Sequence, residues 1–368
     1  MIAFFPITIL LVIYSWWRLR FLFPKKYRNY GALLFGLCFV SFFFQRVFNN
    51  ELASMAFQAV GSFTVVFLTN WLIICLLWDL FLGIRRLLKK SKQANKILRM
   101  RIEPILGGAT ITLAIIFLLL SLPWHFGFET RTVRVDLATS PKKPLKIAAF
   151  ADIHFDPLFP KSKLKRLLDT LHVLQPDAVF FTGDLADISA DILNARGLDS
   201  LFKQINPPLG FFASMGNHEV YMEKKRTIEW LRGMDNVIVL MDSTACNEFF
   251  CVSGRLDHQF ERRLGTQRAS LKELMPENDS IPWFILDHQP KGLDKQDTAL
   301  SRFPDFAVSG HTHAGQFFPA TIIIRFIWRL HYGLGNLDGV PWYVTSSIGQ
   351  WMPIRVGSKT ELAIFELL

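Results

Sequence analysis

Cysteine is scarce in this chain, which has four cysteines among 368 residues. So few thiols exclude a disulfide-dense scaffold and a zinc site built from clustered cysteines. Cys38 and Cys75 fall in apolar runs, where a thiol packs as a small hydrophobic group. Cys246 and Cys251 flank the short segment Asn-Glu-Phe-Phe. This spacing suits a disulfide-closed hairpin but does not demand one, so both alternatives stay open.

Acidic residues are nearly missing from residues 1–144. This part carries 18 Lys and Arg against 5 Asp and Glu, whereas residues 145–368 carry 23 against 26. The net charge of +10 and the pI near 9.5 therefore originate in the amino-terminal part. Because the remainder is mildly acidic, we expect no nucleic-acid partner.

Polar stretches are short in the amino-terminal part, where four apolar runs cover residues 2–17, 32–44, 52–78 and 104–124. A membrane-spanning helix needs about 20 apolar residues. The third and fourth runs are long enough, the first is just adequate, and the second needs its flanks. We predict a four-helix transmembrane region at 1–128. Buried helices of a soluble domain are the alternative, which a content of 51% hydrophobic residues with 35 Phe disfavours.

Basic residues between the runs predict the orientation. They fill the first and third connections, whereas the second has only Arg46 against Glu51. These basic residues are Arg18, Arg20, Lys25, Lys26 and Arg28, then Arg85, Arg86, Lys89, Lys90, Lys92, Lys96, Arg99 and Arg101. By the positive-inside rule both connections are cytoplasmic. We therefore expect a multi-pass protein of a bacterial inner membrane, with bilayer lipid as a partner and residues 145–368 outside the cytoplasm. Residues 1–17 lack a basic start and a small-residue cleavage pattern, which favours an uncleaved span over a signal peptide.

Internal repeats and low-complexity tracts are absent from the rest of the sequence, whose pattern is that of an α/β domain. Residues 129–144 are polar and alternating and end in two prolines, which predicts an edge strand and a short linker. Strand-like runs at 145–151, 178–182, 209–214 and 306–309 alternate with helical spacing at 162–175, 190–204 and 224–234. This order predicts a layered α/β domain at 145–368. Residues 340–345 and 362–367 are predicted as strands of a second sheet.

Five short polar blocks follow apolar runs in this domain. They are Asp152-Ile153-His154, Gly183-Asp184, Gly216-Asn217-His218-Glu219, Asp287-His288 and Gly310-His311-Thr312-His313. Side chains at the carboxyl ends of adjacent strands converge on one edge of a sheet. So many ligand-type groups would repel or stay unsatisfied without cations between them. Each block alone is an ordinary cap, turn or surface loop, but together they predict a two-metal site.

The donor types indicate the metal. Carboxylates, an amide and imidazoles without thiolate suit two divalent metal ions such as Mn, Fe or Zn. Two cations about 3.5–4 Å apart need a shared ligand. Asp184 is the natural bridge, because it lies at a strand end between the other donors.

The five blocks, in this order, closely resemble the calcineurin-like metallophosphoesterases, whose pattern runs D-x-H, G-D-x-x-D, G-N-H-[DE], H and G-H-x-H. The resemblance extends from about residue 145 to the C-terminus. Residues 344–367, with Gly349, Arg355 and Glu361, look like the C-terminal block of the YkuE-like, membrane-associated members. The resemblance implies a two-sheet β-sandwich flanked by helices.

The same resemblance implies a role for each matching residue. One metal would be held by Asp152, His154, Asp184 and His313, and the other by Asp184, Asn217, His288 and His311. His218 would be the general acid that protonates the leaving oxygen, while a hydroxide held between the metals attacks phosphorus. Asp187 and Asp287 would orient ligands or cap loops.

Two classes of function remain in view. The first is a membrane-anchored hydrolase of phosphoric mono- or diesters. An extracytoplasmic site favours a lipid or envelope phosphodiester over the acylated UDP-sugars that related enzymes cut, because nucleotide-sugar precursors are made inside the cell. The second is a membrane scaffold or regulatory protein with a catalytically silent phosphoesterase domain, which the intact ligand set and His218 disfavour.

The segment 317–330, directly after the last block, is apolar and contains Arg325 and Arg329. One hypothesis is that it borders the site and dips into the membrane surface or meets a lipid tail. The alternative is a core strand or helix of the second sheet.

Overall fold

The structure is a computed structural model that describes residues 4–20, 23–44, 51–89, 91–187, 190–221, 224–297 and 300–368. Ile2, Arg46 and Lys90, which belong to the predicted spans and connections, lie outside the described residues. The chain divides into two compact units. The first comprises Met1–Ser121 with Met352–Ile354, and the second comprises Leu122–Trp351 with Arg355–Leu368.

The first unit is helical. Its helices are α1 (Phe4–Leu19), η2 (Lys25–Tyr27), α2 (Arg28–Phe44), α3 (Glu51–Leu87) and α4 (Lys92–Phe126), whose residues 122–126 belong to the second unit. Among the described residues, two helices are long and apolar enough to cross a membrane, Leu52–Leu87 and Lys92–Phe126. With 16 and 17 residues, α1 and α2 are only about 24–26 Å long, whereas the hydrocarbon core is about 30 Å thick. The prediction of four spans is therefore wrong for the described residues, which contain two candidates.

An ionic network joins α1, α3 and α4 within this unit. The buried guanidinium of Arg18 lies 3.1 Å from a carboxylate oxygen of Asp79 and 3.1 Å from one of Glu103. Arg99 and the hydroxyl of Tyr14 also donate to Asp79, at 2.8 and 2.7 Å. These contacts hold the short helix α1 against both candidate spans.

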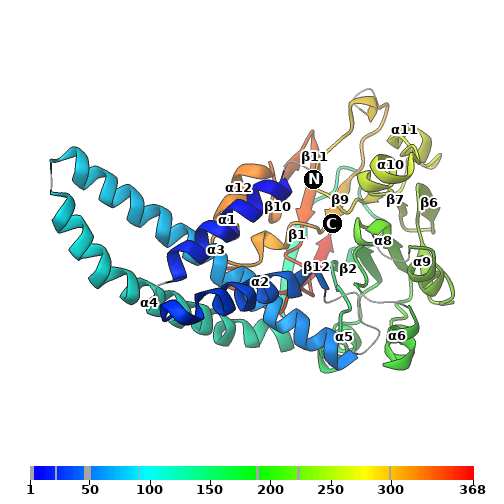
Figure 1. Cartoon of the computed structure of the whole chain (residues 1–368). Coiled ribbons are helices and arrows are strands. Elements are labelled where there is room, and N and C mark those ends of the chain that lie inside the picture. Colours follow the sequence, from blue (N-terminus) through cyan, green and yellow to red (C-terminus); the bar gives the residue numbers. More distant parts are fainter. Residues whose placement is uncertain are drawn as a thin grey trace. The chain divides into compact units, whose positions relative to one another are not determined.

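The second unit is built on two six-stranded sheets (Figure 1). The first sheet has the order β1 (Glu129–Val135), β12 (Glu361–Leu367), β2 (Leu145–Phe150), β3 (Ala178–Thr182), β4 (Phe211–Ser214) and β5 (Val237–Val239). Every neighbouring pair is parallel except β12 and β2. The prediction that 362–367 joins the second sheet is wrong, because β12 inserts between β1 and β2.

The second sheet has the order β10 (Gly333–Leu337), β11 (Val340–Val344), β9 (Phe306–Ser309), β8 (Trp283–Leu286), β7 (Cys251–Gly254) and β6 (Ser243–Cys246). Its four central strands are parallel, and β10 and β6 pair antiparallel at the two edges. The runs predicted at 306–309 and 340–345 are both strands of this sheet.

Side-chain alternation explains why the sheets stack. Along β2, Leu145, Ile147 and Ala149 enter the core between the sheets, whereas Ala148 and Phe150 point to the opposite face. Successive strand residues face opposite sides, so a strand that is apolar throughout is buried on both. The α/β class with two packed sheets is confirmed.

Helices cover the outer face of the first sheet, where their apolar residues join one core cluster. They are α5 (Lys161–Leu174), α6 (Ala190–Ala195), α7 (Leu198–Phe202) and α9 (Lys224–Arg232). The single helix expected at 190–204 is divided at Gly197, whose φ of 62° is left-handed. Other short helices of the unit are α8 (His218–Tyr221), α10 (His258–Leu264), α11 (Leu271–Leu274) and α12 (Ala320–Ile327).

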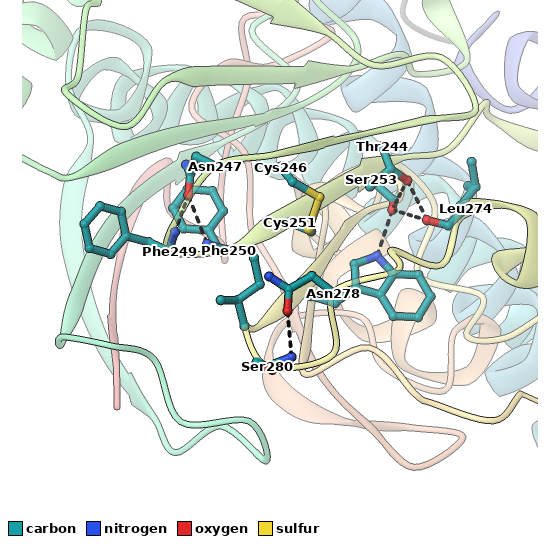
Figure 2. Close-up of a disulfide and its surroundings, with 12 residues drawn as sticks. Thr244, Cys246, Asn247, Phe249, Phe250, Cys251, Ser253, Leu274, Asn278 and Ser280 are labelled. Atoms are coloured by element: carbon teal, nitrogen blue, oxygen red, sulfur yellow. Dashed lines mark hydrogen bonds between the residues drawn. A yellow bond between two sulfur atoms is a disulfide. The ribbon is translucent and has the colours of Figure 1, made fainter.

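A disulfide between Cys246 and Cys251 joins the edge strand β6 to β7 (Figure 2). The turn between them is closed by the side-chain oxygen of Asn247, which accepts the backbone N–H groups of Phe249 and Phe250 at 2.8 and 3.0 Å. Of the two alternatives left open by the sequence, the structure has the disulfide.

Candidate metal centre

The predicted donors all follow strands that end on one rim of the two sheets. Asp152, Asp184 and Asn217 come after β2, β3 and β4 of the first sheet, whereas His288 and His311 come after β8 and β9 of the second. Parallel strands carry their following loops to the same edge. The strand before His288 was not predicted, although the four-residue apolar run Trp283–Leu286 is its signal in the sequence.

Five of the predicted ligands have left-handed backbone conformations, with φ between 48° and 69°. They are Asp152, His154, Asp184, His311 and His313. This region costs a non-glycine residue about 1 kcal/mol or more, and such residues cluster at functional sites. Close packing of the loops also requires glycine, because a Cβ on Gly183 would lie 2.3 Å from the backbone nitrogen of Gly216.

One group of donors consists of Asp152, His154 and His313, all buried. The Nε2 atoms of His154 and His313 are 3.2 Å apart, and Asp152 Oδ1 lies 3.6 Å from His313 Nε2. Two ligands bound to one cation at 2.0–2.2 Å are about 3.0–3.6 Å apart. The three side chains therefore have the spacing of a metal site. The Nε2 atoms of His154 and His313 face each other, and a cation between them could bind both.

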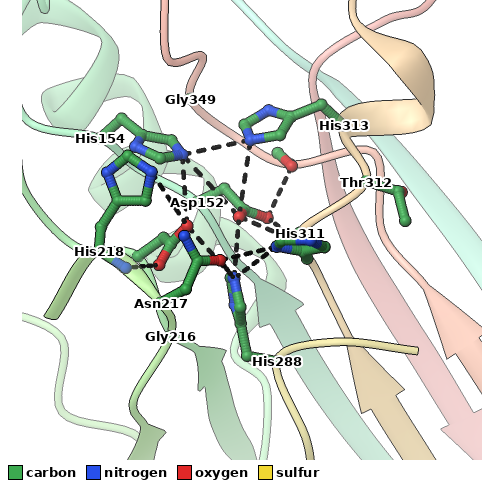
Figure 3. A network of polar contacts seen from close by, with 12 residues as sticks. Asp152, His154, Gly216, Asn217, His218, His288, His311, Thr312, His313 and Gly349 are labelled. Atoms are coloured by element: carbon green, nitrogen blue, oxygen red, sulfur yellow. Dashed lines mark hydrogen bonds and ion pairs between the residues drawn. The ribbon is translucent and has the colours of Figure 1, made fainter. Parts of the chain in front are cut away.

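A second group consists of Asp184, His288 and His311, with the amide of Asn217 beside them. Asp184 Oδ2 lies 3.2 Å from His288 Nε2, while Asn217 Oδ1 lies 2.8 Å from His311 Nδ1 and 3.1 Å from His288 Nε2. Asp184 Oδ2 is also 3.7 Å from His154 Nε2 of the first group. One carboxylate thus lies between both groups, and Figure 3 shows the imidazoles gathered around Asp152 and Asn217.

Contacts on the outer side of the imidazoles fix which nitrogen faces the rim. His288 Nδ1 donates to the carbonyl oxygen of Thr182 at 2.7 Å, so its Nε2 faces the other donors. The carboxylate of Asp187 meets Nδ1 of His218 and lies 3.4 Å from Nδ1 of His154. Asp187, His154 and His218 also satisfy the spacing of a metal site, but Asp187 contacts the Nδ1 atoms, as an orienting group does.

Glu219 stabilises the loops that follow β3 and β4. Its buried carboxylate accepts the backbone N–H groups of Asp184, Leu185 and Gly216 at 3.0, 2.7 and 2.7 Å. The loop after β3 is thereby tied to the loop after β4.

Two further residues hold the first group. Ser347 donates to Asp152 Oδ2 at 2.7 Å, and the buried guanidinium of Arg355 lies 3.2 Å from His313 Nδ1. No role for Ser347 could be predicted, because one serine after a strand has no distinguishing signal in the sequence. Asp287, which was expected to orient a ligand or cap a loop, contacts two arginines. Its carboxylate pairs with Arg268 and lies 3.9 Å from Arg255.

Electrostatics at the rim favour the forms that bind cations. Burial opposes ionisation of Asp184, yet the imidazoles of His288 and His218 hold the pKa of its carboxyl well below the usual range. Burial lowers the pKa of His311 to about 3 and that of His313 well below its ordinary value, so both rings are neutral.

The pKa shifts of the remaining rim groups, Asp152 and His288, show that the rim attracts positive charge. Burial raises the pKa of Asp152. Burial also disfavours charge on His288, but the carboxylates of Asp184 and Asp152 raise its pKa well above the ordinary value. A cation between these groups would replace the proton on His288 and keep Asp152 ionised. The donor set therefore fits divalent metal.

Proteins of similar sequence are named metallophosphoesterases, which agrees with a metal-binding site at this rim. Residues 145–315 match the calcineurin-like phosphoesterase family. An uncharacterized metallophosphoesterase of Campylobacter jejuni is 31% identical over 298 residues, which cover 79% of this chain and 76% of the relative. The YkuE metallophosphoesterase of Bacillus subtilis is 24% identical over 261 residues, covering 64% and 83%. The chain belongs to the calcineurin-like metallophosphoesterase family.

A transmembrane protein with a metallophosphoesterase domain from Danio rerio is 30% identical over 232 residues, which cover 59% of this chain. The match spans about half of that relative, 52% of its length. Together with the two apolar helices, this likeness indicates membrane association.

Proposed function

We propose that this chain is a membrane-anchored phosphoesterase that uses two divalent metal ions to hydrolyse phosphoric mono- or diesters. The observation that carries the proposal is the convergence of the seven donors on one rim, with Asp184 between two groups of ligands. Asp152, His154 and His313 would hold one ion and Asn217, His288 and His311 the other. Bound there, the ions would lower the pKa of a shared water and neutralise phosphoryl oxygens.

His218 is the proposed general acid. Its Nδ1 is engaged by Asp187, and its Nε2 lies 3.9 Å from Asp184 Oδ2, at the border of the donor groups. Its side chain keeps 16% of its surface exposed, whereas those of His154 and His288 keep 1% or less. An imidazole that is oriented on one side and open on the other can hand a proton to the leaving oxygen of a bound ester.

Two observations support an extracytoplasmic active site. The basic residues around the connection between the two candidate spans, α3 and α4, favour a cytoplasmic location for that loop, and the disulfide Cys246–Cys251 is favoured by an oxidising compartment. On that side of a bacterial inner membrane, phosphodiesters of lipids or of the envelope are the substrates within reach.

Metal content tests the centre independently of any substrate. The full chain, purified in detergent with manganese, should carry two metal ions by elemental analysis. Asp184→Asn should reduce this to one or fewer, because the shared carboxylate is lost. The matched control Asp191→Asn, an acid on α6 with 78% of its side chain exposed, should still carry two.

Activity tests the reaction. Bis(p-nitrophenyl) phosphate, p-nitrophenyl phosphate and a panel of phospholipids should reveal hydrolysis that a chelator abolishes and added manganese restores. A metal-loaded chain that cleaves none of these esters would contradict the proposal and favour a silent scaffold. An empty rim under metal-replete conditions would contradict the two-metal centre itself.

A further inference from the structure

The helix α12 exposes its apolar side. Ile322, Ile323, Phe326 and Ile327 are 49%, 51%, 86% and 65% exposed, and no residue of the helix is buried. Residues i and i+4 lie on one face, so these four form one continuous stripe. A surface helix normally turns such a stripe to the core, and an exposed one marks a binding surface. The alternative of a core helix or strand for 317–330 does not hold for these eight residues.

The stripe adjoins the candidate metal centre. The ring of Trp328, at the carboxyl end of α12, packs edge-on against His311 with the ring centroids 5.3 Å apart. Thr312, between two predicted ligands, donates to the carbonyl oxygen of His331 at 2.7 Å. A molecule held by the stripe would therefore reach the rim.

The start of α12 is also close to the end of a candidate span. Just before α12, the backbone of Phe318 donates to the carbonyl oxygen of Val356 at 3.0 Å. Four residues further on, the hydroxyl of Thr360 donates to the carbonyl oxygens of Trp124 and Gly127, where α4 ends. Four residues extend over at most about 14 Å. Within the second unit, α12 thus begins near the point at which the chain would leave the bilayer.

These features together fit one occupant. Leu122 and Phe126, in the last turn of α4, are 43% and 54% exposed and continue the apolar surface of a helix long enough to cross the membrane. Arg325 is exposed beside the stripe and offers a cation to lipid phosphate. A bilayer surface supplies both an apolar layer and phosphate at that depth.

We propose that α12 lies in the lipid surface at the mouth of the metal centre and that the substrate is a phosphoester of a membrane lipid. This inference rests on the proposed function for the reaction and on the exposed stripe for the surface. The lipid tails would remain beside Phe326 and Ile327 while the headgroup reaches the rim past Trp328.

Spin-label accessibility tests the surface without any substrate. A label is placed at Phe326→Cys in the full chain carrying Cys38→Ala and Cys75→Ala, in nanodiscs of phosphatidylcholine and phosphatidylglycerol. The label should be reached by oxygen and shielded from a water-soluble nickel chelate. The matched control is Val173→Cys, an apolar residue 80% exposed on α5, whose label should be open to the chelate. Equal chelate access at both positions would overturn the proposal.

Kinetics test the substrate class. Ile323→Asp with Phe326→Asp should lower kcat/KM at least tenfold for a nanodisc phospholipid that the unaltered chain cleaves, and less than twofold for bis(p-nitrophenyl) phosphate. Equal losses on both substrates would overturn delivery from the membrane. A chain that cleaves no phospholipid would overturn the lipid substrate, whereas a chain that cleaves no ester would overturn the proposed function and leave the label result standing.

Discussion

The environment of His218 sets it apart from the other histidines of the rim. Its Nδ1 is engaged by Asp187, and its Nε2 is near the donors without belonging to either of the two ligand groups that surround Asp184. We expect His218→Ala to lower kcat at least ~100-fold, because proton transfer to the leaving group is lost. The metal content should be unchanged.

The control for this substitution is His172→Ala, an exposed histidine on α5 that should keep full activity. Asp187→Asn should lower kcat, because His218 loses the carboxylate that engages its Nδ1 and orients the ring. Loss of metal from His218→Ala would contradict the acid role and make this residue a ligand.

Glu219 is expected to matter for stability more than for chemistry. Glu219→Ala would leave three buried backbone donors without an acceptor, and each unsatisfied donor costs about 1–3 kcal/mol. The free energy of unfolding should fall by at least about 3 kcal/mol, measured in detergent. Glu277→Ala, at an exposed position, should change it by less than about 0.5 kcal/mol.

At this scale the structure brings the predicted donors to one rim, and the signal for them in the sequence is that each polar block directly follows an apolar run. It did not predict the contacts that orient them. Ser347 and Arg355 approach Asp152 and His313 from positions about 200 and 40 residues away in the chain. Such pairings depend on the folded packing and leave no local pattern.

Among the elements, the β6–β7 hairpin lies at one edge of the second sheet, and a disulfide links its two strands. The loop is short, and the chain-entropy relation gives about 2 kcal/mol of stabilisation. Cys246→Ser with Cys251→Ser should lower the melting temperature of the second unit, and reductant should lower that of the unaltered chain by the same amount. A further loss on adding reductant to the double variant would show that the effect has another source.

The sequence located most strands and misassigned one. The runs at 178–182 and 306–309 coincide with β3 and β9. The pattern of 362–367 is that of a strand as well, but which sheet it joins depends on pairing with β1 and β2. Hydrophobic alternation specifies two faces and does not specify neighbours.

At the scale of the whole molecule, the sidedness of the membrane is open to direct measurement. A cysteine at Val173, with Cys38 and Cys75 replaced by alanine, should react with an impermeant maleimide in intact bacterial cells. A cysteine at Lys92, in the basic connection before α4, should react only after permeabilisation. The reverse pattern would place the metal centre in the cytoplasm.

The number of spans shows where composition alone misleads. The sequence has four apolar runs, but in the part of the chain that the structure describes, α1 and α2 have 16 and 17 residues and are shorter than the hydrocarbon core is thick. Arg18, at the end of α1, is held by Asp79 and Glu103. Both partners belong to other helices, so the local sequence around Arg18 does not predict these ion pairs.

The pairing of β1 with β12 has a practical consequence for anyone who wants the globular half in water. These strands are joined in parallel along seven residue pairs. A shortened chain starting at residue 145 would lack β1, so the backbone N–H and C=O groups of β12 on that side would have no partner strand. Such an unpaired edge strand promotes edge-to-edge aggregation. A shortened chain that starts at 122 keeps the sheet whole, so β1, the strand that directly follows α4, is also a structural part of the second unit.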